Sequence, residues 1–320
     1  GGWAFEFHNN LYPDIDDASL VVKALHLADL GPREEPRKAD AIRRGVNWMV
    51  GLQCDNGGWA AFDKNNTRKY LSQLPFSDFG EVLDPPSADV TAHVLEMLGR
   101  LGYTRDFPPV KRGYGFLRRE QEEDGSWFGR WGVNYIYGIG AVLPALAAIG
   151  EDMGQPYVRN AVDWLLEHQN EDGGWGESCG SYVDPDLHGV GPSTASQTSW
   201  ALIGLLAAGE ADHPATHKGV RYLVATQKED GTWDEPYFTG TGFPGYGIGE
   251  RVKKLPKPGE RGYQGLEMSA GFMINYHLYR NIWPLLALGR YRALAARSTE
   301  KQLSHNNSSE ATARFTEGRD

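Results

Sequence analysis

The sequence predicts an all-α protein whose helices form a double ring, and three observations support this fold class. One signature recurs four times along the 320 residues, and apolar residues recur at helical spacing through most of the chain. Amphipathic helices also alternate with nearly all-apolar ones, such as those at 134–149 and 193–209. This alternation places the apolar helices inside and the amphipathic ones outside. No strand alternation and no βαβ pattern competes with the prediction.

Each copy of the signature closes a helix with Gln and places Trp six positions later, with acidic or amide residues and glycine between them. A glutamine at a helix end can hydrogen-bond unpaired groups of the next element while the indole stacks over it. We therefore predict that each copy joins one helix end to its neighbour in a repeated array, with the tryptophans in the core. The four pairs are Gln53 and Trp59, Gln121 and Trp127, Gln169 and Trp175, and Gln227 and Trp233.

The first three residues look like the tail of a fifth copy. Gly1-Gly2-Trp3 matches the end of the signature, but no Gln stands before it. We expect the chain to begin inside a repeat, so that the ring is incomplete at its N-terminus. Missing helices would expose an apolar wall, and we therefore expect these 320 residues to be inactive alone.

Apolar periodicity and helix-end signals define the expected helices in order. Between them, the stretches 54–86 and 176–192 are rich in Gly, Pro and Asp, and loops of that length are commonly functional or lid-like. The expected helices cover 16–30, 37–52, 87–102, 108–122, 134–149, 155–169, 193–209, 214–228 and 268–290.

Composition narrows the function classes. The formal net charge is −10, which argues against a nucleic-acid partner because phosphate binding favours a basic face. Only two cysteines occur, Cys54 and Cys179, so no disulfide framework is expected. No uninterrupted apolar run is long enough to span a bilayer, so any membrane contact is expected to be peripheral or monotopic.

Three carboxylates stand together in Tyr12-Pro13-Asp14-Ile15-Asp16-Asp17-Ala18-Ser19, just before an apolar run. Asp14, Asp16 and Asp17 are therefore expected at the first turn of a helix. In one interpretation they cap the helix and complement its dipole. In the other, crowded carboxylates cannot all ionise, so one stays protonated and is available as an acid. Aromatic residues just upstream would raise the pKa of that acid further.

A second element can tune this acid. Asp84-Pro85-Pro86-Ser87-Ala88-Asp89-Val90-Thr91-Ala92-His93 reads as a Pro-bounded helix start that places Asp89 and His93 on one face. Such a pair is more often a structural contact than a catalytic one. A histidine held cationic by Asp89 would, however, stabilise a neighbouring carboxylate after that carboxylate has donated its proton.

Together these motifs closely resemble the squalene-hopene cyclases. The resemblance rests on the Gln-Trp copies, the Asp-X-Asp-Asp cluster, Trp127-Phe128-Gly129-Arg130-Trp131-Gly132-Val133-Asn134-Tyr135 and Gly240-Thr241-Gly242-Phe243-Pro244-Gly245. It runs from residue 1 to about residue 292. It implies a class II triterpene cyclase whose catalytic domain is an (α/α)6 barrel. We expect that domain over 1–296, truncated at its N-terminus, and a disordered tail over 297–320, where Ser, Asn, Glu and Thr dominate.

The resemblance implies a role for each member of the acid cluster. Asp16 matches the family's proton donor, and Asp14 and Asp17 match its carboxylate partners. His93 with Asp89 matches the group that orients and strengthens the acid. The cluster continues Ala18-Ser19 where the commoner family form has Thr-Ala, which leaves all three acids in place.

The resemblance also implies a substrate cavity lined by aromatic residues. Phe76 and Ser77 match the place where the family's substrate channel narrows. Phe62 stands where some members carry Tyr, so a hydroxyl is absent there. The cavity-lining positions are matched by Phe5, Phe62, Trp131, Tyr137, Phe243, Phe272, Tyr276 and Tyr279.

The implied reaction is the proton-initiated cyclisation of squalene to hopene, hopanol or both. Protonating an alkene needs a strong, desolvated acid, and aromatic faces then stabilise the cation without trapping it. We expect neither a cofactor nor a metal. The expected setting is the surface of a bacterial cytoplasmic membrane, with monotopic association, and a homodimer is left open.

Two other functions remain as alternatives. A protein prenyltransferase β-subunit is also a helical toroid with related repeats, and its zinc needs Asp, Cys and His ligands. Cys179, Asp184, Asp186 and His188 lie near one another in the sequence, although their spacing matches no strong zinc motif. A noncatalytic toroidal binding domain is the third interpretation, in which the acidic cluster would tolerate substitution.

Overall fold

The computed structural model describes residues 1–296 apart from 6–7, 69–70, 72–82, 183 and 245–270, while 297–320 lie outside the described part. Residues 279–296 are helical, and there are two short 3-10 segments, η3 (Cys179–Tyr182) and η4 (Pro185–Leu187), in the described part of the chain. The other helices are α1 (Ile15–Leu27), α2 (Glu35–Gly51), α3 (Ala88–Arg100), α4 (Pro108–Glu120), α5 (Tyr135–Ala148), α6 (Pro156–Glu167), α7 (Ala195–Ala207) and α8 (Pro214–Thr226).

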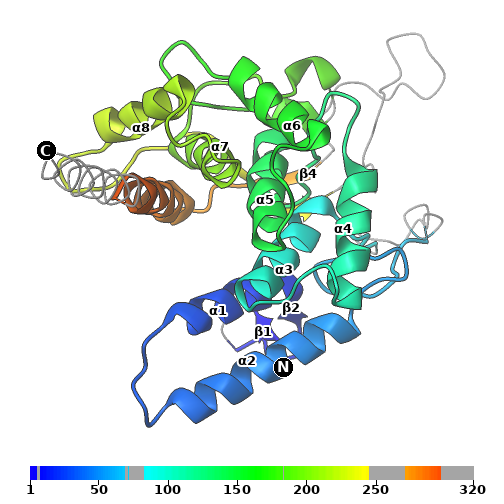
Figure 1. Ribbon diagram of the computed structural model, residues 1–320. Coiled ribbons are helices and arrows are strands. Elements are labelled where there is room, and N and C mark those ends of the chain that lie inside the picture. Colours follow the sequence, from blue (N-terminus) through cyan, green and yellow to red (C-terminus); the bar gives the residue numbers. More distant parts are fainter. Residues whose placement is uncertain (6–7, 69–70, 72–82, 183, 245–270, 297–320) are drawn as a thin grey trace, which may run out of the picture.

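The helices alternate between an inner and an outer row (Figure 1). α1, α3, α5 and α7 pack side by side in that order, and each also packs against the helix that follows it. Nearly every residue of α3, α5 and α7 is buried, whereas α4, α6 and α8 bury one stripe each. The nearly all-apolar α5 and α7 belong inside, α3 is buried there although it carries polar residues, and the predicted double-layered all-α fold is confirmed.

The helix at 279–296 takes the next inner position. In two earlier units, the backbone N–H of the repeat tryptophan donates to a threonine near the start of the following inner helix, as Trp175 N does to Thr198 Oγ1 at 2.9 Å. Trp233 N donates to Asn281 Oδ1 at 3.2 Å in the corresponding way. The described chain therefore contains five successive inner helices.

Glutamine amides join consecutive outer helices. The Gln53 Nε2 group donates to the Gly57 carbonyl at 2.8 Å and to the Pro109 carbonyl, in the first turn of α4, at 2.9 Å. Gln121 and Gln169 make the same pair of bonds one and two units later, reaching α6 and α8. The clamp expected from the sequence is thus present in the first three copies, whereas among the described residues Gln227 of the fourth copy donates only to the Gly231 carbonyl, at 2.9 Å.

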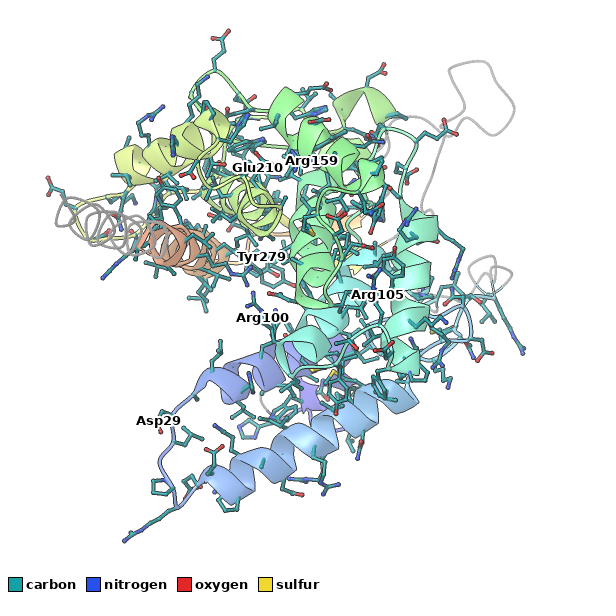
Figure 2. All side chains as sticks on the ribbon, viewed as in Figure 1. Asp29, Arg100, Arg105, Arg159, Glu210 and Tyr279 are labelled. Carbon is teal, nitrogen blue, oxygen red and sulfur yellow. The ribbon has the colours of Figure 1, made fainter. Side chains whose placement is uncertain are left out.

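The tryptophan of each copy completes the clamp. Its indole Nε1 donates to a carbonyl in the last turn of its own outer helix, at 2.7 or 2.8 Å in all four copies. Carbonyls in the last turn of a helix commonly lack a full set of helical partners, although the Met49 carbonyl also accepts the Leu52 N–H at 3.1 Å. All four indoles are fully buried, as predicted, and ion pairs such as Arg159–Glu210 link neighbouring units on the outside (Figure 2).

Trp3 holds the place that a repeat tryptophan holds elsewhere. It pairs with Asp14 in the short antiparallel ribbon of β1 (Trp3–Ala4) and β2 (Pro13–Asp14), as Trp59 pairs with Ser87. Asp14 and Ser87 are the N-cap residues of α1 and α3. The first three residues thus correspond structurally to the tail of a repeat.

One predicted helix boundary is wrong. The helix expected over 268–290 begins at 279, because Gly271–Ile274 forms strand β4 and pairs antiparallel with β3 (Gly240–Pro244). The apolar run at 271–274 is compatible with either a helix or a strand, and periodicity cannot separate the two over so few residues. Pairing with β3, whose Thr241 N–H also donates to the Trp131 carbonyl in the loop after α4, selects the strand.

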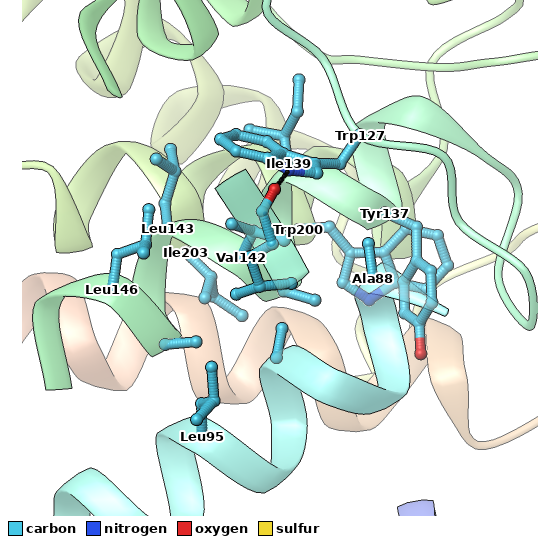
Figure 3. Close-up of a cluster of buried hydrophobic side chains, with 14 of the residues drawn as sticks. Ala88, Leu95, Trp127, Tyr137, Ile139, Val142, Leu143, Leu146, Trp200 and Ile203 are labelled. Carbon is cyan, nitrogen blue, oxygen red and sulfur yellow. Dashed lines mark hydrogen bonds between the residues drawn. The ribbon is translucent and has the colours of Figure 1, made fainter. Parts of the chain in front are cut away.

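The core lies between the inner helices (Figure 3). Leu95 of α3, Leu143 and Leu146 of α5, and Ile203 of α7 meet there and are nearly or fully buried. Trp127 closes one side, with its indole bonded to the Leu117 carbonyl. The N-terminal turns of the same inner helices carry the polar residues of the candidate site.

Candidate active site

The start of α1 is built by the acid cluster itself. Asp14 is the N-cap, and its Oδ1 accepts the backbone N–H of Asp17 at 2.9 Å. The Ile15 N–H donates to the Ala61 carbonyl at 2.8 Å, which ties this helix start to the loop after Trp59. The capping interpretation is therefore correct for Asp14, and it leaves the side chains of Asp16 and Asp17 free for other contacts.

Asp16 meets a histidine from the neighbouring inner helix. The Nδ1 atom of His93, on α3, lies 2.5 Å from Asp16 Oδ1. The His93 side chain is 6% exposed and that of Asp16 is 21% exposed. A buried imidazole thus contacts a carboxyl group that is partly exposed. The predicted proximity of these two residues is present in the structure.

The carboxylate of Asp89 hydrogen-bonds to groups other than His93, its expected partner. Among the described residues, its carboxylate accepts the Ser87 hydroxyl and the backbone N–H of Trp131, the latter at 2.8 Å. The direct partner of His93 is Asp16 rather than Asp89. Asp89 therefore anchors the segment that carries Trp131, and it favours the imidazolium of His93 only through its charge.

Burial and mutual repulsion favour protonated carboxyl groups in the cluster. Burial, followed by the charge of Asp16, raises the pKa of Asp14 to about 8. The same two causes raise the pKa of Asp17 to about 6. Burial disfavours the imidazolium of His93, but the Asp16 carboxylate outweighs it and raises the pKa of His93. The cluster and His93 together can retain protons at neutral pH.

A continuous series of aromatic rings starts at His93. Its ring centroid is 6.0 Å from that of Tyr137, which lies 4.7 Å from Trp200. Trp200 is 6.0 Å from Tyr279, and Tyr279 is 4.6 Å from Tyr276. The series connects α3, α5, α7 and the helix at 279–296, and Tyr279 lies between that helix and α5 in Figure 2.

Three tyrosine hydroxyls lie within electrostatic reach of the acid. Burial, with the charge of Asp16 next, raises the pKa of Tyr137 well above its usual value. Burial and carboxylate charges including that of Asp16 also raise the pKa of Tyr276 and Tyr279. These side chains therefore stay neutral at physiological pH.

Phe5 adjoins this series, and Phe62 makes a separate aromatic pair with Trp131. Phe5 packs edge-on against Tyr276, with ring centroids 6.2 Å apart, and Phe62 packs edge-on against Trp131 at 6.0 Å. Phe62 is held by Asp84, whose Oδ2 accepts the backbone N–H of Phe62 at 2.6 Å. Both phenylalanines are exposed in the described structure, Phe5 to 60% and Phe62 to 41%.

The structure describes four of the predicted site residues only in part or not at all. Phe76 and Ser77 are outside the described residues. Phe243 and Phe272 face each other in the β3–β4 register, but their side chains are not described. The sequence prediction also missed Trp200, whose helical spacing resembles an ordinary core position and gives no distinguishing signal.

The zinc alternative has no geometric support. No group of three or more His, Cys, Asp or Glu side chains in the described part is arranged to hold a metal ion. Cys179 Sγ instead lies 3.4 Å from the Phe238 carbonyl oxygen, and His188 packs on Tyr135 with ring centroids 3.8 Å apart. Within the same described ranges, no helix has the length and apolarity needed to cross a bilayer.

Residues 1–249 match the family model of the squalene-hopene cyclase C-terminal domain. The chain belongs to this family. It is 53% identical over 292 residues to the squalene-hopene cyclase of Alicyclobacillus acidocaldarius, covering 91% of the chain and 42% of that relative. It is 47% identical over 298 residues to the probable squalene-hopene cyclase of Sinorhizobium fredii, covering 92% and 42%. The chain thus spans about two fifths of the length of these relatives.

A solved structure supports the fold of this squalene-hopene cyclase family member. A type II terpene cyclase from Scytonema aligns with a TM-score of 0.57 over 89% of the chain and 75% of that protein. The two sequences are 20% identical, so this likeness concerns the fold alone. The resemblance inferred from the motifs is confirmed at the level of the family and of its α/α toroid fold.

Proposed function

We propose that this protein, at its full natural length, catalyses the proton-initiated cyclisation of squalene to hopene, hopanol or both. One observation carries the proposal: Asp16 contacts the buried His93 at 2.5 Å, inside a three-carboxylate cluster from which the aromatic series begins. Family membership supports it, because relatives at 45–53% identity are named squalene-hopene cyclases.

The reaction begins with proton transfer from a carboxylic acid to carbon. The O–H bond of protonated Asp16 breaks, and the proton adds to the less substituted carbon of a terminal alkene, leaving a tertiary cation. Successive double bonds supply electron pairs that close the rings. The last cation loses a proton to give hopene, or takes up water and loses a proton to give hopanol. No oxidant or reductant is needed, because the skeleton is only rearranged or hydrated.

Asp16 is the proposed donor because of its position. Asp14 is 7% exposed and is occupied as the helix cap, so it is poorly placed to touch a substrate. Asp16 keeps an open side while His93 contacts its other oxygen. A protonated His93 stabilises the carboxylate that remains after proton donation. Asp14 and Asp17 act as partners that hold further protons near this site.

The aromatic residues serve the cation that follows. Aromatic faces stabilise a nearby cation by about 0.5–2 kcal/mol each and are weak nucleophiles. Tyr137, Tyr276 and Tyr279 lie close enough to Asp16 for its charge to act on their hydroxyls. Trp131, Phe5 and Phe62 are proposed to extend the lining, and Phe243 and Phe272 to join it from the β3–β4 ribbon.

The decisive experiment removes the acid while keeping its shape. Asp16→Asn in the full-length protein should lower cyclisation of squalene by roughly 10²-fold or more while the melting temperature changes little. Asp14→Asn and Asp17→Asn are the matched comparisons, assayed at equal amounts of folded enzyme. If Asp16→Asn stays active and one of the others is inactive, the donor is misassigned. If all three remain active, the cluster is only a helix cap.

The cellular setting is a separate proposal. Squalene dissolves in lipid rather than in water, so the enzyme is proposed to take it up at the surface of a bacterial cytoplasmic membrane, by monotopic association. Co-sedimentation of the full-length protein with liposomes tests this, and a protein that stays in the supernatant would contradict it. Light scattering of the detergent-solubilised protein would show whether it is a homodimer.

A further inference from the structure

A second buried carboxylate lies where three helices meet. Glu96, on α3, is one turn beyond His93 and is almost fully buried. Its Oε2 lies 2.6 Å from Lys23 Nζ of α1, and its Oε1 lies 2.9 Å from Arg290 Nη2 of the helix at 279–296. Glu96 therefore connects three of the inner helices through two ion pairs.

Each of these helices carries a residue of the proposed active site. Lys23 is seven residues after Asp16 and lies on the same face of α1, because seven residues make about two helical turns. His93 and Glu96 likewise share a face of α3. The helix that carries Arg290 begins at Tyr279. The Lys23–Glu96 pair and the Asp16–His93 contact thus lie along the same interface, between α1 and α3, and the Arg290–Glu96 pair joins α3 to the helix that begins with Tyr279.

Two cations hold the buried Glu96 carboxylate in its ionised form. Burial acts to raise the pKa of Glu96, but the cations of Lys23 and Arg290 outweigh it and hold the pKa at about 2. The side chains of Lys23 and Arg290 are 16% and 25% exposed, so solvent screens these pairs less than it screens surface pairs. Arg100 also approaches Glu96, at 3.5 Å, but it belongs to α3 and is 53% exposed.

We propose that Glu96 is a positioning residue for the cyclisation, which holds α1 and the helix at 279–296 against α3. The Lys23 pair keeps Asp16 in contact with His93, and the Arg290 pair keeps Tyr279 within the aromatic series. The inference rests on the proposed function. Small displacements of a reacting group can lower rates by about 10²-fold, so loss of either ion pair should have a measurable effect on the reaction.

Loss of the Lys23–Glu96 ion pair and loss of the Arg290–Glu96 ion pair should change different properties of the reaction. Lys23→Met keeps the apolar part of the side chain but removes the ion pair that links α1 to α3. The kcat for squalene should therefore fall about tenfold or more, while KM and the product ratio stay unchanged. Arg290→Met should instead raise the share of partly cyclised products, because Tyr279 then shields the cation less well. Glu96→Gln should show both effects. Arg100→Met is the matched control and should behave as the parent, because it removes a contact within α3 only.

A double substitution separates positioning from general stability. If Lys23 acts through the Asp16–His93 contact, Lys23→Met should cause little further loss of kcat in a His93→Ala enzyme. Equal losses in both backgrounds would overturn the inference, as would parental kinetics in Lys23→Met and Arg290→Met. Losses that only follow a fall in folded protein, measured by thermal melting, would overturn it too. An unsubstituted enzyme that leaves squalene unchanged would overturn the proposed function, and this inference with it.

Discussion

Three neighbouring aspartates have three different environments. Asp14 caps α1 and is buried, Asp16 contacts His93 and keeps an open side, and Asp17 has one buried oxygen, Oδ2, without a hydrogen-bond partner in the described structure. The start of a single helix thus offers a cap, a proposed donor and a proton-holding partner. Environment rather than residue type separates their roles.

The pKa values of the cluster predict a pH dependence. Folding raises the pKa of Asp17 from 3.8 to about 6 and that of Asp14 to about 8, so the folded protein binds these protons more tightly than the unfolded chain does. The associated stability is complete below about pH 4 and is lost as the pH rises through 6 and then 8. Initiation also needs a proton, so kcat should fall over the same window.

Measuring kcat and the melting temperature between about pH 5 and 9 checks this prediction. Asp14→Asn cannot titrate at position 14, so it should remove the part of the decline in melting temperature near pH 8. A rate that is level across the window, in an enzyme that stays folded, would contradict the assignment of the cluster as the proton source.

Substitutions of the tuning residues should be less severe than loss of the donor. His93→Ala removes the imidazole that contacts Asp16, and about tenfold to 10²-fold lower turnover is expected. Asp89→Asn should have a smaller effect, because Asp89 anchors Trp131 and reaches His93 only through its charge. Initial rates with squalene at saturating concentration provide the test. Losses as large as that of Asp16→Asn would show that His93 takes part in proton donation directly.

At the level of elements, the Gln-Trp clamp makes a testable contribution to stability. Gln169 Nε2 donates to the Gly173 and Ala215 carbonyls, both at 2.8 Å, and so joins α6 to α8. Gln169→Ala leaves these acceptors without that donor, and the free energy of unfolding should fall by about 1–3 kcal/mol. Denaturant unfolding followed by circular dichroism measures the change.

The fourth copy supplies the matched control. Among the described residues, Gln227 donates only to Gly231, at 2.9 Å, and its side chain is exposed. Gln227→Ala should therefore change the unfolding free energy by no more than about 0.5 kcal/mol. Equal losses from both substitutions would mean that the amide stabilises the local turn rather than the contact between helices.

Across the whole molecule, stability should decrease from the inner row outward. α3, α5 and α7 are buried along almost their entire length, whereas the outer helices expose one side. Amides of the inner three helices should therefore exchange hydrogen most slowly. Hydrogen exchange followed by mass spectrometry of peptides from the full-length protein tests this order. Faster exchange in α5 than in α4 or α6 would contradict it.

Much of this architecture can be predicted because its signals are local. The expected helix at 108–122 appears as Pro108–Glu120, and that at 214–228 appears as Pro214–Thr226, because proline marks the first turn and apolar spacing marks the buried face. The acid cluster was placed at a helix start for the same reason. Local signals do not predict the strand at Gly271–Ile274, because pairing with residues 27 to 34 positions earlier determines it.

The sequence by itself determined the repeats, the inner and outer rows, the placement of three carboxylates at one helix start, and the family. All of these depend on spacing along a single helix or on motifs within a few residues. Only the tertiary structure decided that His93 bonds Asp16 rather than Asp89, that Trp200 continues the aromatic series, and that Glu96 joins three helices. Those contacts link residues about 60 to 190 positions apart, where packing between helices rather than local spacing determines which side chains meet.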